Sequence, residues 1–133
     1  MKPANAPSPE NPVVLFGRFV RDCRLSLKAT ARSVANAAGM QPSNLCALEH
    51  GMQQPPQNHE KLRRLAAALH LEIGTQEFAN FADLAAKANN STPIDLAQIL
   101  TENDAMPVLL RTIGNKKLTK ADLRRISEFV RAT

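Results

Sequence analysis

Glycine is scarce in this sequence, with five residues among 133, and no stretch alternates β-branched residues with polar ones. Strands and hairpins need such stretches and the turns between them. Alanine and leucine instead recur at spacings of three and four residues, which is typical of amphipathic helices. The composition therefore predicts an all-α protein, long enough for one core or for a small domain with an appendage.

Long apolar runs are also missing. No segment approaches the roughly eighteen consecutive apolar residues of a membrane-spanning helix. The N-terminus has no apolar region of the kind found in secretory signals. We therefore expect a cytoplasmic protein that has no membrane partner.

Patterns for catalysis and metal binding are absent as well. The two cysteines, Cys23 and Cys46, have no CxxC neighbours and no histidine at metal-ligand spacing. Neither a serine–histidine–acid group nor a glycine-rich phosphate loop can be assembled. We therefore expect no catalytic residue, no metal and no cofactor. We interpret Cys23 as a small core residue on the apolar face of the first helix.

The charge of the chain is unevenly distributed. The formal net charge is +5, from 17 lysines and arginines against 12 acids. Residues 1–73 carry nine basic residues and five acids, whereas residues 74–133 carry eight and seven. Most of the excess lies in the N-terminal half, as a nucleic-acid-binding surface requires. The alternative is an ordinary solvated basic face.

The stretch from Thr30 to Gly51 carries the clearest local pattern. Two short runs with helical spacing flank Gly39, and each run places its apolar residues where the other can bury them. Gly39 lies where the backbone must turn sharply, because a residue without Cβ reaches the left-handed region at little steric cost. Gln41 and Pro42 suit the N-cap and the first position of the second helix. The apolar residues are Val34, Ala35, Ala38, Met40, Leu45 and Leu48.

This spacing is that of a helix-turn-helix, and the sequence resembles the phage-repressor (Cro/cI-type, XRE) family of transcriptional regulators. The resemblance runs from Phe16 to about Ile73. The alternative is an αα-hairpin in a helical bundle, in which the glycine is an ordinary helix C-cap. The matching residues are Thr30, Val34, Ala35, Gly39, Leu45, Leu48, Glu49, His50 and Gly51.

The resemblance implies a lambda-repressor-like five-helix DNA-binding domain. We place this domain at residues 13–73, after a proline-rich arm at 1–12 that we expect to be disordered. A C-terminal helical extension at 74–133 follows, for dimerisation or partner binding. The protein would be a sequence-specific DNA-binding transcriptional regulator, a repressor that binds double-stranded DNA as a homodimer on a two-fold related site. The alternative is an antitoxin or a protease-controlled repressor whose C-terminal helices bind a toxin or protease partner.

The resemblance also implies roles for individual residues. In this family the second helix of the motif lies in the major groove, and the first lies across the DNA backbone. Arg24 and Glu49 are expected to form an ion pair between the first helix of the domain and the end of the recognition helix. The base-facing residues would be Gln41, Ser43, Asn44 and Ala47. The phosphate-facing residues would be Thr30, Arg32, His50, Gln53 and Gln54, with glutamines in a loop where many family members have lysine or arginine.

The other helices are predicted from their caps and apolar stripes. A helix that begins after Asp104 should end at Gly114. Capping boxes are expected for Thr92 with Asp95 and for Thr119 with Asp122. Further helices are expected over residues 13–28, 59–70 and 76–88. Asn58 and Thr75 are the expected N-caps of the last two, and Thr30 is expected to open the first helix of the motif.

The C-terminal helices carry more large apolar side chains than such short helices can bury among themselves. We expect this face to lie in a homodimer interface, because an exposed patch beyond a few hundred Å² is unusual in a soluble monomer. In the alternative, the face closes over Phe78 and Phe81 of the same chain. Its residues are Leu109, Leu110, Ile113, Leu123, Ile126, Phe129 and Val130.

Overall fold

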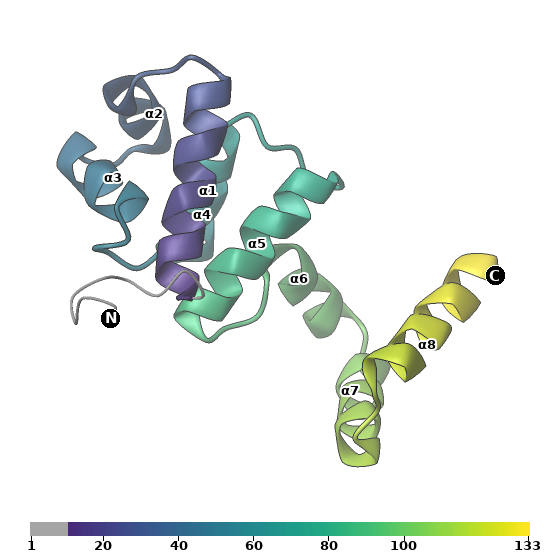
Figure 1. Cartoon of the computed structure of the whole chain (residues 1–133). Coiled ribbons are helices and arrows are strands. Elements are labelled where there is room, and N and C mark those ends of the chain that lie inside the picture. Colours follow the sequence, from purple (N-terminus) through teal and green to yellow (C-terminus); the bar gives the residue numbers. More distant parts are fainter. Residues whose placement is uncertain (1–10) are drawn as a thin grey trace. The chain divides into compact units, whose positions relative to one another are not determined.

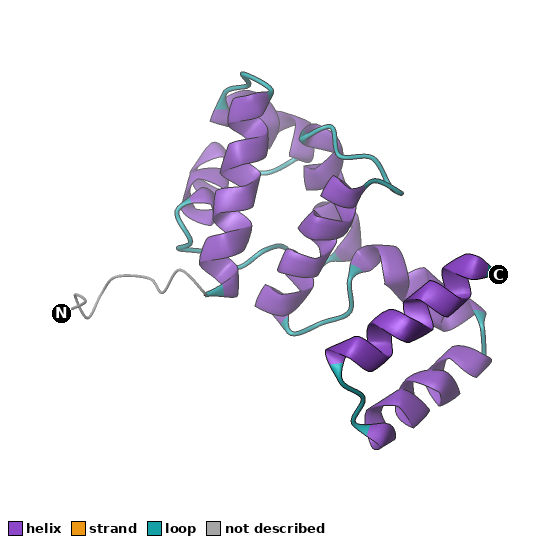
Figure 2. Cartoon of the chain, turned by 45° about the vertical axis from the view of Figure 1, so that its right-hand side comes forward, coloured by secondary structure: helices purple, strands orange, loops and turns teal. Residues whose placement is uncertain are grey.

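The computed structural model describes residues 11–133, so most of the arm expected at residues 1–12 lies outside the described residues. All regular secondary structure in this range is helical, which confirms the all-α class (Figure 1, Figure 2). No helix of the described part is long and apolar enough to cross a membrane. The helices are α1 (Pro12–Ser26), α2 (Ala31–Ala38), α3 (Pro42–Glu49), α4 (His59–Ala68), α5 (Gln76–Asn89), α6 (Ile94–Glu102), α7 (Ala105–Lys116) and α8 (Lys120–Ala132).

The chain divides into two units, and the boundary falls within α6, between Ala97 and Gln98. In the first unit α1 lies between α5 on one side and α2 and α3 on the other (Figure 1). The ring of Phe81 on α5 lies 5.2 Å from that of Phe16 on α1, between centroids. The expected division after Ile73 assigns α5 to the extension, whereas in the structure its aromatic residues belong to the core of the first unit.

Four of the expected N-caps are present with their side-chain hydrogen bonds. Thr30, Asn58 and Thr75 each accept a hydrogen bond from the backbone N–H three residues further along. Thr119 and Asp122 form the reciprocal capping box at the start of α8. These local bonds satisfy N–H groups that a helix leaves without an internal partner, so they fix where the helices begin.

The capping box expected for Thr92 and Asp95 is not formed. The helix begins one residue later, at Ile94, and the Pro93 carbonyl accepts from the backbone N–H groups of Leu96 and Ala97. Proline now occupies the N-cap position and has no N–H that the Asp95 carboxylate could accept. One Asp95 oxygen is buried without a hydrogen-bond partner among the described residues.

The limits of α7 also differ from expectation. The Asp104 side chain makes no capping bond, and Asn103 Oδ1 instead accepts from the Ala105 N–H at 2.9 Å. Gly114 does not end the helix, because α7 continues to Lys116. The left-handed residue that ends it is Lys117, with φ 51°. Glycine within a helix costs only about 1 kcal/mol relative to alanine, so a single glycine does not force an end.

Candidate nucleic-acid interface

The turn between α2 and α3 is built around Gly39. Its φ of 71° and ψ of 31° lie in the left-handed region, where a side chain would strain the backbone. The N–H of Met40 then reaches back to the Ala35 carbonyl at 2.9 Å. This pattern closes the end of α2 and turns the chain into α3 within three residues, 39–41, so the two helices cross closely.

Helix α3 has an inner face that is buried and an outer face that is exposed. Leu45 and Leu48 are fully buried against the core, together with Val34 and Ala35 of α2. Gln41 precedes α3 at the N-cap position but makes no side-chain capping bond, so its amide remains available to other partners. Among the residues expected to face bases, Gln41, Ser43 and Asn44 are exposed and Ala47 is half-buried.

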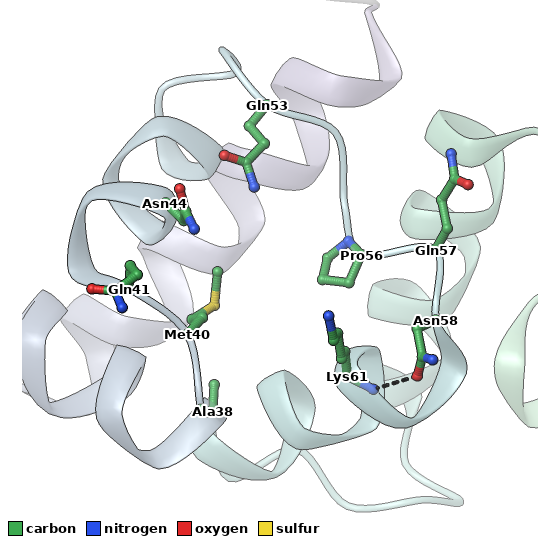
Figure 3. A pocket seen from close by; sticks show the side chains of 10 residues that line it. Ala38, Met40, Gln41, Asn44, Gln53, Pro56, Gln57, Asn58 and Lys61 are labelled. Atoms are coloured by element: carbon green, nitrogen blue, oxygen red, sulfur yellow. Dashed lines mark hydrogen bonds between the residues drawn. The ribbon is translucent and has the colours of Figure 1, made fainter.

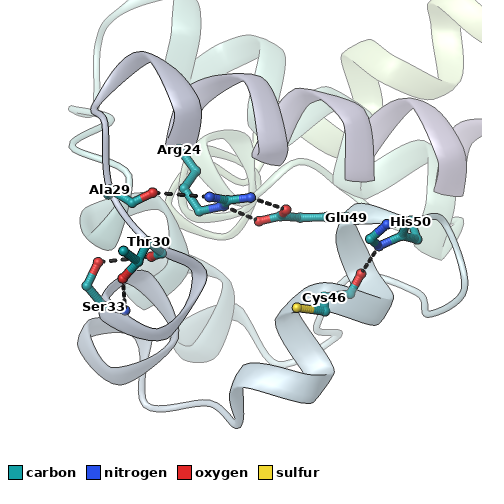
Figure 4. Close-up of polar contacts among 7 residues, drawn as sticks. All are labelled: Arg24, Ala29, Thr30, Ser33, Cys46, Glu49 and His50. Atoms are coloured by element: carbon teal, nitrogen blue, oxygen red, sulfur yellow. Dashed lines mark hydrogen bonds and ion pairs between the residues drawn. The ribbon is translucent and has the colours of Figure 1, made fainter.

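The ion pair between Arg24 and Glu49 is present and is bidentate (Figure 4). Arg24 Nε lies 2.7 Å from Glu49 Oε2, and Nη2 lies 2.8 Å from Oε1. Arg24 Nη1 also donates to the Ala29 carbonyl at 3.1 Å. The Glu49 side chain is 3% exposed, and its hydrogen bond raises the pKa of Arg24, so the guanidinium stays charged. The pair holds the last turn of α3 against the last turn of α1.

A second attachment of α3 to α1 depends on Gly17, which the sequence pattern did not single out. A Cβ at this position would lie 2.1 Å from the Leu48 carbonyl oxygen and 3.1 Å from that of Glu49. The two helices therefore meet backbone to backbone at the end of α3. A glycine inside an amphipathic run is only a weak signal of such a close approach, so the sequence alone does not reveal it.

The residues expected to face phosphates do not share one environment. Thr30, Arg32 and Gln54 are exposed, and Gln53 is half-buried. The hydroxyl oxygen of Thr30 already accepts the N–H of Ser33 at the start of α2. His50 is exposed at the end of α3, where its Nδ1 lies 2.7 Å from the Cys46 carbonyl oxygen (Figure 4).

A hollow of about 380 Å³ lies beside the start of α3, lined also by the following loop and the start of α4. Figure 3 shows Gln41, Asn44 and Gln53 on one side of it and Lys61 and Asn58 on the other. Met40 also lines it, and Lys61 is the only charged residue that does. The fold thus brings a loop glutamine close to two residues expected to face bases.

The part of this surface formed by α2, α3 and the following loop carries no unpaired acid. Between Thr30 and Asn58 the sequence contains one carboxylate, that of Glu49, and Arg24 neutralises it. Arg32 is the only lysine or arginine in the same range. A polyanion that approaches α2 and α3 therefore meets mostly neutral hydrogen-bonding groups and little repulsion.

Known proteins give no direct help with this surface. No protein-family model, no curated protein and no solved structure matches the chain. What bears on function is therefore the chain's own geometry: the tight turn, the exposed outer face of α3, and the two attachments of α3 to α1.

Both cysteines are free thiols. Cys46 is exposed on α3, one helical turn before His50 and three residues after Ser43. Cys23 is half-buried on α1; burial raises the pKa of its thiol, and the carboxylates of Asp22 and Glu77 raise it further. Among residues 11–133, no three His, Cys, Asp or Glu side chains are grouped so as to hold a metal ion.

Proposed function

We propose that this protein is a sequence-specific regulator that binds double-stranded DNA through α2 and α3, and that it acts as a repressor with a lambda-repressor-like domain. The observation that carries the proposal is that α3 exposes one face while its C-terminal end is held in place. Its outer face is polar and exposed at the N-terminal end, while its other end is fixed to α1 by the Arg24–Glu49 pair and the contact at Gly17. A helix held this way can enter the major groove without losing packing.

The outer face of α3 offers groups that distinguish base pairs. The Asn44 amide can bond to N6 and N7 of an adenine, and the Gln41 amide, which no capping bond holds, has the same chemistry. Ser43 accepts or donates, and the methyl group of Ala47 can contact that of a thymine. These four residues supply direct readout over only a few base pairs.

Phosphate contacts would come mainly from neutral groups. Arg32 on α2 supplies a charge, and Thr30, Gln53 and Gln54 supply hydrogen bonds that set the register on the duplex. His50 differs from these residues because one of its ring nitrogens already has a partner: Nδ1 lies 2.7 Å from the Cys46 carbonyl oxygen. When Nδ1 carries the proton, Nε2 can donate to a phosphate only in the imidazolium form. We expect a shallow salt dependence, equivalent to roughly three to five phosphates for two copies of the chain.

The test is binding-site selection from random duplexes with the full-length protein, followed by affinity measurements on the selected site at several salt concentrations. Asn44→Ala should relax the preference at one base pair, at a cost of about 1 to 3 kcal/mol. Arg32→Ala should weaken binding to all sequences alike and reduce the salt slope by about one ion per copy. Both residues are exposed, so neither change should unfold the chain.

Lys116→Ala is the matched control, because it removes one positive charge from exposed surface on α7, outside the first unit. It should leave the base preference unchanged. Selection that enriches no sequence, or an affinity that does not change between low and moderate salt, would exclude the proposed function. Equal losses of discrimination in the Asn44 and Arg32 variants would contradict their assigned roles.

A further inference from the structure

Another hollow, of about 440 Å³, lies in the first unit where α1 faces the end of α4 and the start of α5. We call it the α1–α5 hollow. It is lined by residues between 19 and 27 on and just after α1, by residues 69–71 after α4, and by Glu77 in the first turn of α5. All of these segments belong to the first unit, so the hollow is a feature of that unit alone.

The walls of the α1–α5 hollow are mostly apolar. Phe19 is half-buried, and its ring lies 6.4 Å from that of Phe81, between centroids. Leu69 is buried, Leu71 is half-buried, and Leu27 is 37% exposed. Sites for small molecules are typically concave spaces of several hundred Å³ with apolar and aromatic walls and a few polar groups. The α1–α5 hollow has this size and this kind of wall.

The charged groups of the α1–α5 hollow are acidic. Asp22 on α1 and Glu77 on α5 line it, and no lysine or arginine does. Neither carboxylate has an ion-pair partner within residues 11–133. The thiol of Cys23 lies in the same hollow, where burial raises its pKa and both carboxylates raise it further. Two carboxylates from different helices therefore act on one partly apolar space.

This combination of walls and charges selects for a particular ligand chemistry. A compact, strongly hydrated cation would lose its hydration against apolar walls. A metal ion would also need grouped ligands, which residues 11–133 do not provide. A cation whose charge is shielded by apolar groups loses little hydration and gains both apolar contact and attraction to the carboxylates. Aromatic rings such as that of Phe19 attract cations as well.

We propose that the α1–α5 hollow is a binding site for a small lipophilic organic cation, which packs against Phe19 and Leu27 and is attracted by the carboxylates of Asp22 and Glu77. The outer face of α3 takes no part in this site, because α1 lies between α5 and α3 (Figure 1). The inference therefore does not depend on the proposed DNA binding.

The experiment is isothermal titration calorimetry of the full-length protein, without DNA and in sodium buffer, with two probe ions. Tetraphenylphosphonium and tetraphenylborate have nearly the same shape and opposite charges. The phosphonium should bind at least about tenfold more tightly than the borate, because two carboxylates attract one ion and repel the other. The net charge of +5 favours the borate on the rest of the surface, so a preference for the phosphonium must arise locally.

Substitutions locate the bound ion. Asp22→Asn and Glu77→Gln should each weaken phosphonium binding by about two- to fivefold, as expected for partly screened charges. Asp83→Asn is the matched control, because Asp83 is an exposed acid on the same helix as Glu77 but does not line the hollow. This variant should bind like the wild type. All three carboxylates are exposed, so the changes should leave the fold intact.

Alkylation of the two thiols gives an independent readout. Saturating phosphonium should slow the reaction of Cys23 with iodoacetamide severalfold and leave that of Cys46 unchanged, because only Cys23 lines the hollow. Failure of the phosphonium to bind, or binding of the borate with equal or greater affinity, would overturn the inference. So would an equal loss of affinity in Asp83→Asn, or an unchanged rate at Cys23.

Discussion

The helices of both units are amphipathic and several are well capped, but the two units differ in how far these helices bury their apolar faces. In residues 11–97, each of the five helices from α1 to α5 contributes buried side chains to one core, down to full burial for Phe16 and Phe81. Helices α7 and α8, within residues 98–133, have no buried side chain, although α8 begins with the complete capping box of Thr119 and Asp122. Capping and amphipathic spacing therefore specify a helix, but they do not specify what covers its apolar face.

The largest expected effect tests whether buried polar contacts hold the first unit together. Arg24→Met leaves the Glu49 carboxylate, 3% exposed, without its partner. We expect a loss of about 3 to 5 kcal/mol in the free energy of unfolding. Urea denaturation followed by circular dichroism would measure it. Arg64→Met breaks the exposed pair with Glu60 and should cost less than about 1 kcal/mol. Similar costs for the two variants would show that the Arg24–Glu49 pair is not a buried contact.

The next effect compares a glycine in each unit. Gly17→Ala puts a Cβ 2.1 Å from the Leu48 carbonyl oxygen, so α1 and α3 must move apart. We expect a destabilisation of about 1 to 3 kcal/mol and a further loss of DNA affinity, because α3 shifts. Gly114→Ala meets nothing within 4 Å and should stabilise α7 by about 0.5 to 1 kcal/mol. Thermal unfolding should show a lower melting temperature for Gly17→Ala and a higher one for Gly114→Ala. A Gly17→Ala variant as stable as the wild type would rule out the backbone contact.

The smallest effect concerns the two thiols of the first unit. At neutral pH iodoacetamide should alkylate exposed Cys46 about tenfold or more faster than Cys23, because the thiolate is the reactive form. The raised pKa of Cys23 lowers its thiolate fraction, so its rate should increase mainly at alkaline pH, above the ordinary pKa of a thiol. Peptide mass spectrometry after timed labelling measures both rates, with Cys46→Ser as the control. Faster labelling of Cys23 at neutral pH would contradict its burial.

Much of the first unit could be predicted because its signals are local. The caps at Thr30, Asn58 and Thr75 and the left-handed Gly39 each depend on a few neighbouring residues, and all four lie where the pattern places them. Because such signals depend on so few residues, a small shift in a helix boundary is enough to make a predicted cap wrong. The start of α6 differs by one residue, and that shift is enough to remove the capping box expected for Asp95.

Contacts between distant segments could not be predicted in the same way. The approach of Gly17 to the Leu48 carbonyl joins α1 to α3, and no local pattern announces it. The place of α5 in the first core depends on how its Phe81 meets Phe16, which the spacing within either helix does not determine. The candidate site follows the same division: the outer face of α3 could be predicted from its spacing, whereas the hollow beside Lys61 depends on the path of the loop.

Gln41 occupies the N-cap position of α3 without a side-chain capping bond, so substitutions there need not disturb the start of the helix. Gln41, Ser43 and Asn44 are exposed, and Pro42 rather than a side-chain bond from Gln41 marks the start of the helix. The three residues can therefore be exchanged with little effect on folding. Libraries randomised at these three positions should yield mostly folded proteins, and in the proposed DNA-binding role changes at them would alter the base preference while the fold persists. In the proposed role, the residues that read bases would therefore be separable from those that hold the fold.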